Sequence, residues 1–419
     1  MKLRDIILFG MMLTGFAGCA DFLDVQPQDK QSEKQLFATR GGYYMAVNGI
    51  YNKIAASALY GKNLSFELVD VISKRYQPLL ANTYLTALST FAYTDNSVEK
   101  ELSSTWTAAY NTILNCNVVL ENIDGSVGVL PEQERRMLKG EMLAVRAFLH
   151  FDMLRLFGPV YKLNPDGESI PYNESSRVSV LPLLTADSVI HEKILRDLNE
   201  AESLLANSDP VIAGGPMASL EDGQDVYLRY RQLRMNYYAV LAEKARVYLW
   251  MGNREEALRY ARLVKNAALE GVTPQFTLGP SSALGPVGGN GGNDFVFFNE
   301  QIFAMYIENF DDSQMASAAN SYQYQNNYWI EELFPVVNGM TDIRLYQWYT
   351  STWNASVGMY KRSTRKYSGL RSTETTNASP SRGVPLIRLA EMYLIIAECA
   401  PLDEANEVYR ELLSNRNAP

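Results

Sequence analysis

Residues 236–266, NYYAVLAEKARVYLWMGNREEALRYARLVKN, decide the fold. The first half spaces apolar and small side chains as one face of a helix does, namely Tyr238, Leu241, Ala242, Ala245, Tyr248 and Leu249. Gly252 and Asn253 then turn the chain, because glycine adopts the left-handed backbone that commonly ends a helix. Residues 256–261, EALRYA, begin a second helical pattern. The stretch therefore predicts two antiparallel helices.

The small residues of this pair resemble those of a tetratricopeptide hairpin, in which alanines let two helices approach closely. Similar pairs are predicted within residues 102–157 and at 386–399 with 402–413, whereas 188–205 predicts a lone helix. Because the pairs are not contiguous, an evenly repeating solenoid is not expected. The sequence predicts a mainly α fold, in which tetratricopeptide-like hairpins form a scaffold for long irregular loops and a few short strands.

One further helix precedes this scaffold, and one helix of the pair within 102–157 has an unusual pattern. Residues 34–56 predict the first, since Ser32 and Gln35 have the spacing of a capping box. Residues 131–157 predict another that is apolar on two sides, which is typical of a helix between two layers. His150 lies on it between apolar neighbours, so we interpret it as a core histidine and not as a catalytic base.

Long irregular stretches separate the helices, at residues 162–184, 206–227, 271–294 and 371–383. Loops longer than about 15 residues in a compact domain often carry function, so we expect ligand contacts there. Residues 295–370 are rich in aromatic side chains with partial alternation. That pattern fits either short strands or irregular segments.

The first residues read as a bacterial lipoprotein signal. Lys2 and Arg4 precede an apolar run at 6–13, and residues 16–18, FAG, place small side chains before Cys19. The run is shorter than the roughly 20 residues that a membrane-spanning helix needs. We predict a signal peptide at 1–18, lipidation of Cys19, a leash at 19–33 and a single helical domain at 34–419. The alternative is an ordinary secretory peptide with an incidental cysteine.

Composition narrows the function. The chain has 419 residues and a net charge of -9, which argues against binding to nucleic acid phosphates. No HExxH, CxxC or GxSxG motif is present, so neither a metal centre nor a catalytic residue is assigned. Besides Cys19 there are Cys116 and Cys399, which favour two separate thiols over a disulfide.

Four aromatic residues form the strongest candidate site, with amides between them: Tyr322, Tyr324, Tyr328 and Trp329. Flat rings offer apolar faces to the C–H surface of a sugar, and amides hydrogen-bond its hydroxyls. The cluster therefore suits a neutral glycan, and the alternative is an ordinary core strand or helix rim. Acid pairs such as Glu67 with Asp70 would suit a glycoside hydrolase, but 47 acidic residues produce such pairs by chance.

Several segments together resemble the SusD/RagB family of outer-membrane nutrient-binding lipoproteins. They are residues 19–24 (CADFLD), 144–148 (AVRAF), 155–158 (RLFG), 248–253 (YLWMGN), 341–345 (TDIRL) and 387–394 (IRLAEMYL). The resemblance implies a SusD-like fold that captures an oligosaccharide or polysaccharide without cleaving it. It also implies a lipid-anchored, surface-exposed protein of the outer membrane that passes the ligand to a SusC-like, TonB-dependent transporter.

By position, the resemblance further implies ligand contacts at Asp70, Arg75, Tyr76 and Tyr93, together with the aromatic cluster at 322–329. The family usually continues with a segment bearing arginine and glutamate after its last hairpin, and residues 415–419, NRNAP, do not resemble it. The alternatives are a short relative and a truncated reading frame. No cofactor is expected, and the sequence does not decide whether Ca²⁺ orders a loop. An envelope assembly scaffold and a glycoside hydrolase remain the alternative functions.

Overall fold

The computed structural model describes residues 32–74, 83–177, 179–216, 226–279, 294, 296–307, 323–324, 334, 336–337, 340–344, 349–354, 359–364, 367 and 383–418. Its longer helices are α3 (Arg40–Ile54), α6 (Asn96–Ile123), α7 (Glu132–Phe157), α9 (Leu195–Leu205), α11 (Tyr237–Met251), α12 (Arg254–Lys265), α17 (Leu389–Cys399) and α18 (Leu402–Asn415). Short helical pieces are α2 (Glu33–Leu36), α4 (Leu68–Ile72), α5 (Thr83–Ser89), α8 (Ala186–Ser188), α10 (Val211–Gly214), η2 (Val189–Ile194), η3 (Val226–Leu228), η4 (Arg231–Leu233) and η5 (Phe298–Glu300).

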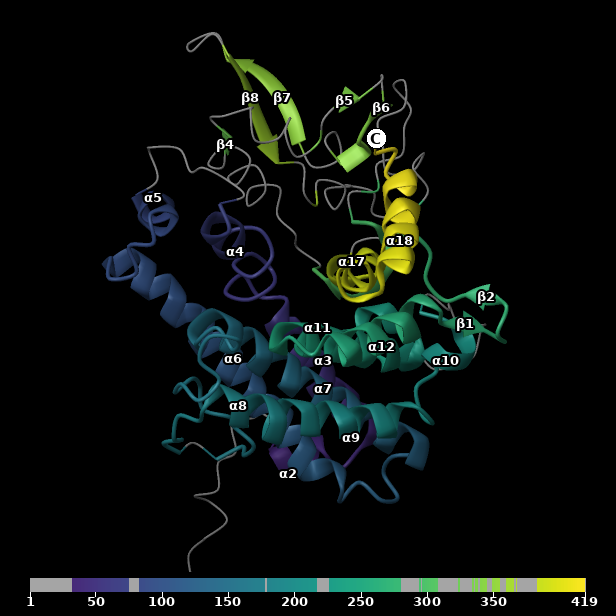
Figure 1. Cartoon of the computed structure of the whole chain (residues 1–419). Helices are drawn as coiled ribbons and strands as arrows, with labels where there is room; N and C mark the ends of the chain where they lie inside the picture. The colour runs from purple at the N-terminus through teal and green to yellow at the C-terminus, as the bar shows by residue number, and fades with distance from the viewer. Residues whose placement is uncertain are drawn as a thin grey trace, which may run out of the picture.

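The long helices form one row in which each packs against the next. The order is α3, α6, α7, α9, α11, α12, α17 and α18. Figure 1 shows this arrangement, with α17 and α18 in yellow beside α12. The predicted mainly α fold is confirmed, and so are the hairpin at 236–266 and the pairing of the two helices within 102–157.

Helix α7 is the centre of the row. All of its residues from Glu141 to Leu154 are buried, since α6 packs on one side and α9 on the other. At Gly140 a Cβ atom would lie 2.9 Å from Leu205 Cγ, so α7 and α9 approach as closely as glycine allows. The prediction of a helix between layers is confirmed.

Gly252 ends α11 with φ +86°, in the left-handed region that favours glycine. Its amide donates to Leu249 O, and Asn253 then caps α12 by accepting from Glu256 N at 3.2 Å. The turn predicted from these two residues is therefore present.

The strands are short. They are β1 (Ala268–Leu269) with β2 (Thr273–Pro274), β3 (Gln301–Tyr306) with β9 (Gly383–Arg388), β4 (Gln323–Tyr324) and β7 (Tyr349–Asn354) with β8 (Met359–Thr364), and β5 (Val336–Val337) with β6 (Met340–Thr341). All pairs are antiparallel. Of the two possibilities for residues 295–370, short strands are therefore found in the described part, and the β7–β8 ribbon lies above the helices in Figure 1.

Two predicted helix boundaries need correction. The helix expected at 34–56 is two helices, because Thr39 caps α3 by accepting from Gly42 N at 3.1 Å. The helix expected from 386 begins at Leu389, because residues 383–388 pair with β3. The capping box of Ser32 and Gln35 is confirmed at the start of α2.

The buried apolar side chains form two large clusters. The main cluster fills the row of helices, and the second joins α4, α5 and the start of α6 to Val384, Phe334 and Tyr367. Leu156 and Leu386 pack against both clusters. The boundary between the two clusters is where the candidate site lies.

Candidate functional site

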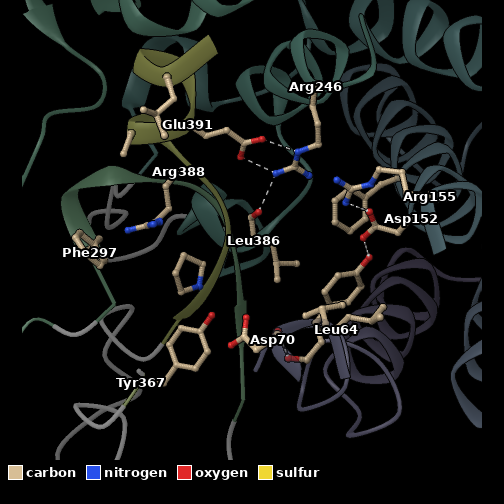
Figure 2. Close-up of a pocket in the computed structure, with 17 residues that line it drawn as sticks. Leu64, Asp70, Asp152, Arg155, Arg246, Phe297, Tyr367, Leu386, Arg388 and Glu391 are labelled. Atoms are coloured by element: carbon tan, nitrogen blue, oxygen red, sulfur yellow. Dashed lines mark hydrogen bonds and ion pairs between the residues drawn. The ribbon is translucent and has the colours of Figure 1, made fainter. Parts of the chain in front are cut away.

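A pocket of about 410 Å³ opens between the two clusters, and we call it the central pocket. Its size falls in the range of small-molecule sites, about 300–1,000 Å³. It is lined by Tyr60, Leu64, Ser65, Val69, Asp70, Phe148, Asp152, Arg155, Arg246, Phe297, Tyr367, Pro385, Leu386, Arg388, Ala390, Glu391 and Leu394. Figure 2 shows Arg246 and Glu391 at one edge of the hollow and Asp70 with Tyr367 at the opposite edge.

Arg246 organises one wall of the central pocket. Its guanidinium binds Glu391 through two hydrogen bonds, Nε to Oε1 at 2.8 Å and Nη2 to Oε2 at 2.7 Å. Nη2 also donates to Leu386 O at 3.1 Å, which ties α11 to β9. Nη1 donates to Glu243 Oε2 at 3.0 Å behind the wall. Such forked ion pairs fix the direction of the side chain as well as its charge.

Asp152 organises the neighbouring wall. It accepts hydrogen bonds from the Tyr60 hydroxyl and from Arg155 Nη2, and its side chain is about 10% exposed. Burial, with Asp152 adding to it, raises the pKa of Tyr60 well above its ordinary value, so Tyr60 stays a neutral donor. Arg155 is about a third exposed and faces the pocket.

The two glutamates bound to Arg246 differ in their protonation. Burial raises the pKa of Glu243 to about 7, partly offset by Arg246. Burial also acts on Glu391, but the charge and hydrogen bonds of Arg246 outweigh it and hold the pKa of Glu391 below its ordinary value. Glu243 Oε1 is buried without a hydrogen-bond partner among the residues described. Glu391 is therefore an ionised acceptor at the pocket surface, whereas Glu243 titrates near neutrality behind it.

Aromatic rings supply the apolar part of the pocket. Tyr60 stacks on Phe148 with centroids 5.4 Å apart, and Tyr367 meets Phe66 edge to face at 6.2 Å. Arg388 lies 4.1 Å above the Phe297 ring, a cation–π contact. Flat rings thus adjoin charged groups on several sides.

The charges of the lining balance. Three arginines (Arg155, Arg246, Arg388) face three carboxylates (Asp70, Asp152, Glu391). Arginine only donates hydrogen bonds and an ionised carboxylate only accepts them, whereas a hydroxyl does both. Together with the rings, this wall suits an uncharged polyhydroxylated ligand.

His150 is a structural residue, as the sequence predicted. It is fully buried, and its ring stacks on Tyr172 with centroids 3.8 Å apart. Nδ1 lies 2.8 Å from Arg146 O, and Nε2 accepts from Asn173 N at 3.0 Å. Burial lowers the pKa of His150 to about 3, so the imidazole is neutral and both nitrogens are used.

The residues predicted for ligand contact have different outcomes. Asp70 lines the central pocket from α4 and is buried. Tyr93 is 47% exposed, packs against Phe91 and does not line the pocket. Tyr324 belongs to β4, whose backbone pairs with β8. Outside the described residues lie Cys19, Arg75, Tyr76, Tyr322, Tyr328 and Trp329.

Sequence reasoning did not assign the other charged residues of the pocket. Asp152 and Arg155 interrupt the apolar helix α7, and Glu243 and Arg246 interrupt the apolar helix α11. Charged residues are rarely buried unless they are paired, so their position in apolar helices was the available signal. Glu391 likewise interrupts the apolar helix α17. Arg388 gave no such signal, because it ends β9, which pairs with residues about 80 positions away.

Within the described ranges no group of three or more His, Cys, Asp or Glu side chains is arranged to hold a metal ion. The same residues include no helix that is both long and apolar enough to cross a membrane. Cys116 and Cys399 are free thiols.

Comparisons with known proteins agree with this architecture. A SusD-like family model, described as starch-binding and associating with the outer membrane, matches residues 21–212. A SusD-like protein of Formosa agariphila is 25% identical over 222 residues, which are 50% of this chain and 39% of that protein. One of Bacteroides ovatus is 26% identical over 197 residues, 46% of this chain and 34% of the relative. The matched regions thus span well under half of these relatives.

Solved structures extend the likeness of fold over most of the chain. A SusD superfamily protein from Bacteroides thetaiotaomicron superposes with a TM-score of 0.69 at 20% identity, covering 90% of this chain and 80% of that one. A laminarin-binding SusD-like protein superposes with a TM-score of 0.62 at 14% identity, covering 91% and 85%. Together these likenesses support assigning the chain to the SusD-like family.

Proposed function

We propose that this protein binds glycans without cleaving them and that the central pocket holds part of the glycan. The observation that carries the proposal is the lining of that pocket, in which paired donors and acceptors alternate with aromatic rings. Each hydroxyl of a sugar can accept from an arginine and donate to a carboxylate, while the ring faces cover its C–H surface. The laminarin-binding relative of the same fold supports this class of ligand.

Two of the three carboxylates of the pocket favour binding over hydrolysis. Asp152 is held by Tyr60 and Arg155, and Glu391 is held by Arg246 in a forked pair. A glycosidase needs one protonated carboxyl group as general acid at the scissile bond. Glu243, whose burial raises its pKa to about 7, lies behind the wall with no exposed surface.

The proposal includes a place in the cell. The segment from Lys2 to Cys19 supports a lipid on Cys19, and the family description supports association with the outer membrane. We further propose that the anchored protein passes its ligand to a SusC-like, TonB-dependent transporter. We expect no cofactor to take part, so glycan binding should survive EDTA, whereas loss of binding in EDTA would indicate that Ca²⁺ orders a loop.

The test is binding of the purified full-length product to a panel of neutral polysaccharides and oligosaccharides, measured by calorimetry. We expect at least one ligand to bind, with no release of reducing ends. Asp70→Asn removes a charged acceptor of the pocket and should weaken binding about tenfold, since hydrogen bonds to charged groups contribute about 1.5–3 kcal/mol. Asp124→Asn, a carboxylate that is 64% exposed and lines no part of the pocket, is the matched control.

Failure of a folded sample to bind any glycan would refute the proposed function. Equal weakening by Asp70→Asn and Asp124→Asn would place the site away from the central pocket. Mass spectrometry of the native amino terminus checks whether Cys19 carries a lipid. Co-purification from the outer membrane checks whether the protein associates with a SusC-like transporter.

A further inference from the structure

A second hollow of about 340 Å³ adjoins the central pocket, and we call it the inner compartment. It shares Leu64, Val69, Asp152 and Arg155 with the central pocket. Two of its lining residues belong to it alone: Leu156 near the end of α7 and Trp250 near the end of α11. The two hollows therefore meet along the Asp152–Arg155 pair.

The inner compartment differs from the central pocket in chemistry. Four of its six lining side chains are apolar or aromatic, and the only charges are Asp152 and Arg155 at the shared edge. Trp250 stands edge to face against Phe151, with ring centroids 6.5 Å apart. A bare sugar hydroxyl pushed against such walls would lose its hydrogen bonds to water, so the walls favour a ligand part that is mostly apolar.

Two hydrogen-bond donors adjoin these apolar walls. Within the described part of the chain, Arg155 makes one hydrogen bond, to Asp152, and its other N–H groups are available. Trp250 Nε1 is buried and has no acceptor among the described residues. A buried donor that is unsatisfied in a native structure calls for an explanation, and a ligand acceptor is one. The ligand part should therefore combine apolar surface with an acceptor that cannot donate.

We propose that the inner compartment takes an acylated sugar unit, one bearing an N-acetyl or O-acetyl group, while the unsubstituted part of the glycan lies in the central pocket. This inference rests on the proposed function. The acetyl methyl group packs against Leu156 and the Trp250 ring. The acetyl carbonyl oxygen, which only accepts, receives a hydrogen bond from Arg155 or from Trp250 Nε1.

The test uses pairs of uncharged glycans that differ only in acylation. Acetylated xylo-oligosaccharides are compared with the same sample after alkaline deacetylation, and chito-oligosaccharides with cello-oligosaccharides of equal length. Affinity of the full-length product is measured across these pairs within the neutral panel. We expect the acylated member of at least one pair to bind at least about tenfold more tightly, the low end of what one apolar group contributes in a hydrophobic pocket.

Two variants locate the effect. Leu156→Phe places a ring in the inner compartment and should lower the ratio of the two affinities, while binding of the unacylated glycan stays as in the wild type. Trp250→Phe keeps an aromatic face but removes the N–H, and should reduce the ratio in part. Leu263→Phe, at a leucine of α12 that is 45% exposed, is the control for the added ring.

The outcomes separate the two proposals. Equal affinity for both members of every pair, or a preference for the bare glycan, overturns the acyl site and leaves the glycan-binding function standing. A preference that Leu156→Phe and Trp250→Phe leave unchanged also overturns it. Binding of no glycan at all removes the proposed function and, with it, this inference.

Discussion

Replacing Glu243 by glutamine should make the protein more stable at pH 8 and change it little at pH 5. Glu243 has no exposed surface. Burial raises its pKa from the ordinary value of 4.5 to about 7; the charge of Arg246 opposes this rise, and the charge of Asp152 adds to it. A raised pKa means that the folded protein holds this proton more tightly than the unfolded chain does. Its contribution to stability is therefore present below pH 4.5 and is lost as the pH rises through 7.

The size of the effect follows from the same two values. The interval from 4.5 to about 7 corresponds to a loss of about 3 kcal/mol in the free energy of unfolding at high pH. Glutamine resembles the protonated acid in shape and charge, so Glu243→Gln should not show this loss. Its oxygen can still accept from Arg246 Nη1, as Glu243 Oε2 does at 3.0 Å.

The assay is urea unfolding at pH 5, 6.5 and 8, with Glu132→Gln on the exposed start of α7 as control. The gain of Glu243→Gln over wild type should be under about 1 kcal/mol at pH 5 and about 3 kcal/mol at pH 8. Other groups titrate alike in both proteins, so the difference isolates Glu243. A difference that does not depend on pH, or a wild type that is more stable at pH 8, would refute the reasoning.

Three further predictions concern the scaffold. Arg231→Met should lower the free energy of unfolding by about 3–5 kcal/mol, because it leaves the buried carboxylates of Glu141 and Asp209 unpaired; a loss under 1 kcal/mol in denaturant would contradict it. Burial raises the pKa of Cys116 to about 12, so iodoacetamide should alkylate this thiol in urea but not in the native protein. Mass spectrometry measures the alkylation, and labelling of the native protein would contradict the buried position. Gly252→Ala should cost about 1 kcal/mol in the same unfolding assay, since φ is +86° there, and an unchanged midpoint would show that the turn differs.

The sequence allowed the helical scaffold to be predicted because each hairpin is specified locally. The stripe through Tyr238 and Ala245, the turn at Gly252 and the double-sided pattern of α7 are all readable within 30 residues. The boundary at Leu389 was missed, because residues 383–388 take their strand conformation from pairing with β3, which no local pattern reveals.

The pocket was predictable only in part, for the same reason. Asp70 was assigned by resemblance and does line it. The other charged residues of the pocket lining come mainly from α7, α11 and α17. Whether their side chains lie close together depends on how the helices pack in the row. Charged residues in apolar helices indicate that a partner exists, but the sequence does not name it. Arg246 and Glu391, which lie 145 residues apart, were therefore recognised as a pair only in the structure.

Because β3 pairs with β9, which lies about 80 residues later in the chain, the pocket can form only after the helices that precede it have been synthesised. Tyr306 pairs with Gly383, and the following residues Leu386 and Glu391 supply the acceptors that orient Arg246. Ribosomes release the chain from its amino terminus, so the helices up to α12 emerge and can associate well before these acceptors exist. A nascent chain that stops before β9 could form the helical scaffold but not the complete pocket. Any affinity for the ligand would therefore appear only after the last part of the chain has been made.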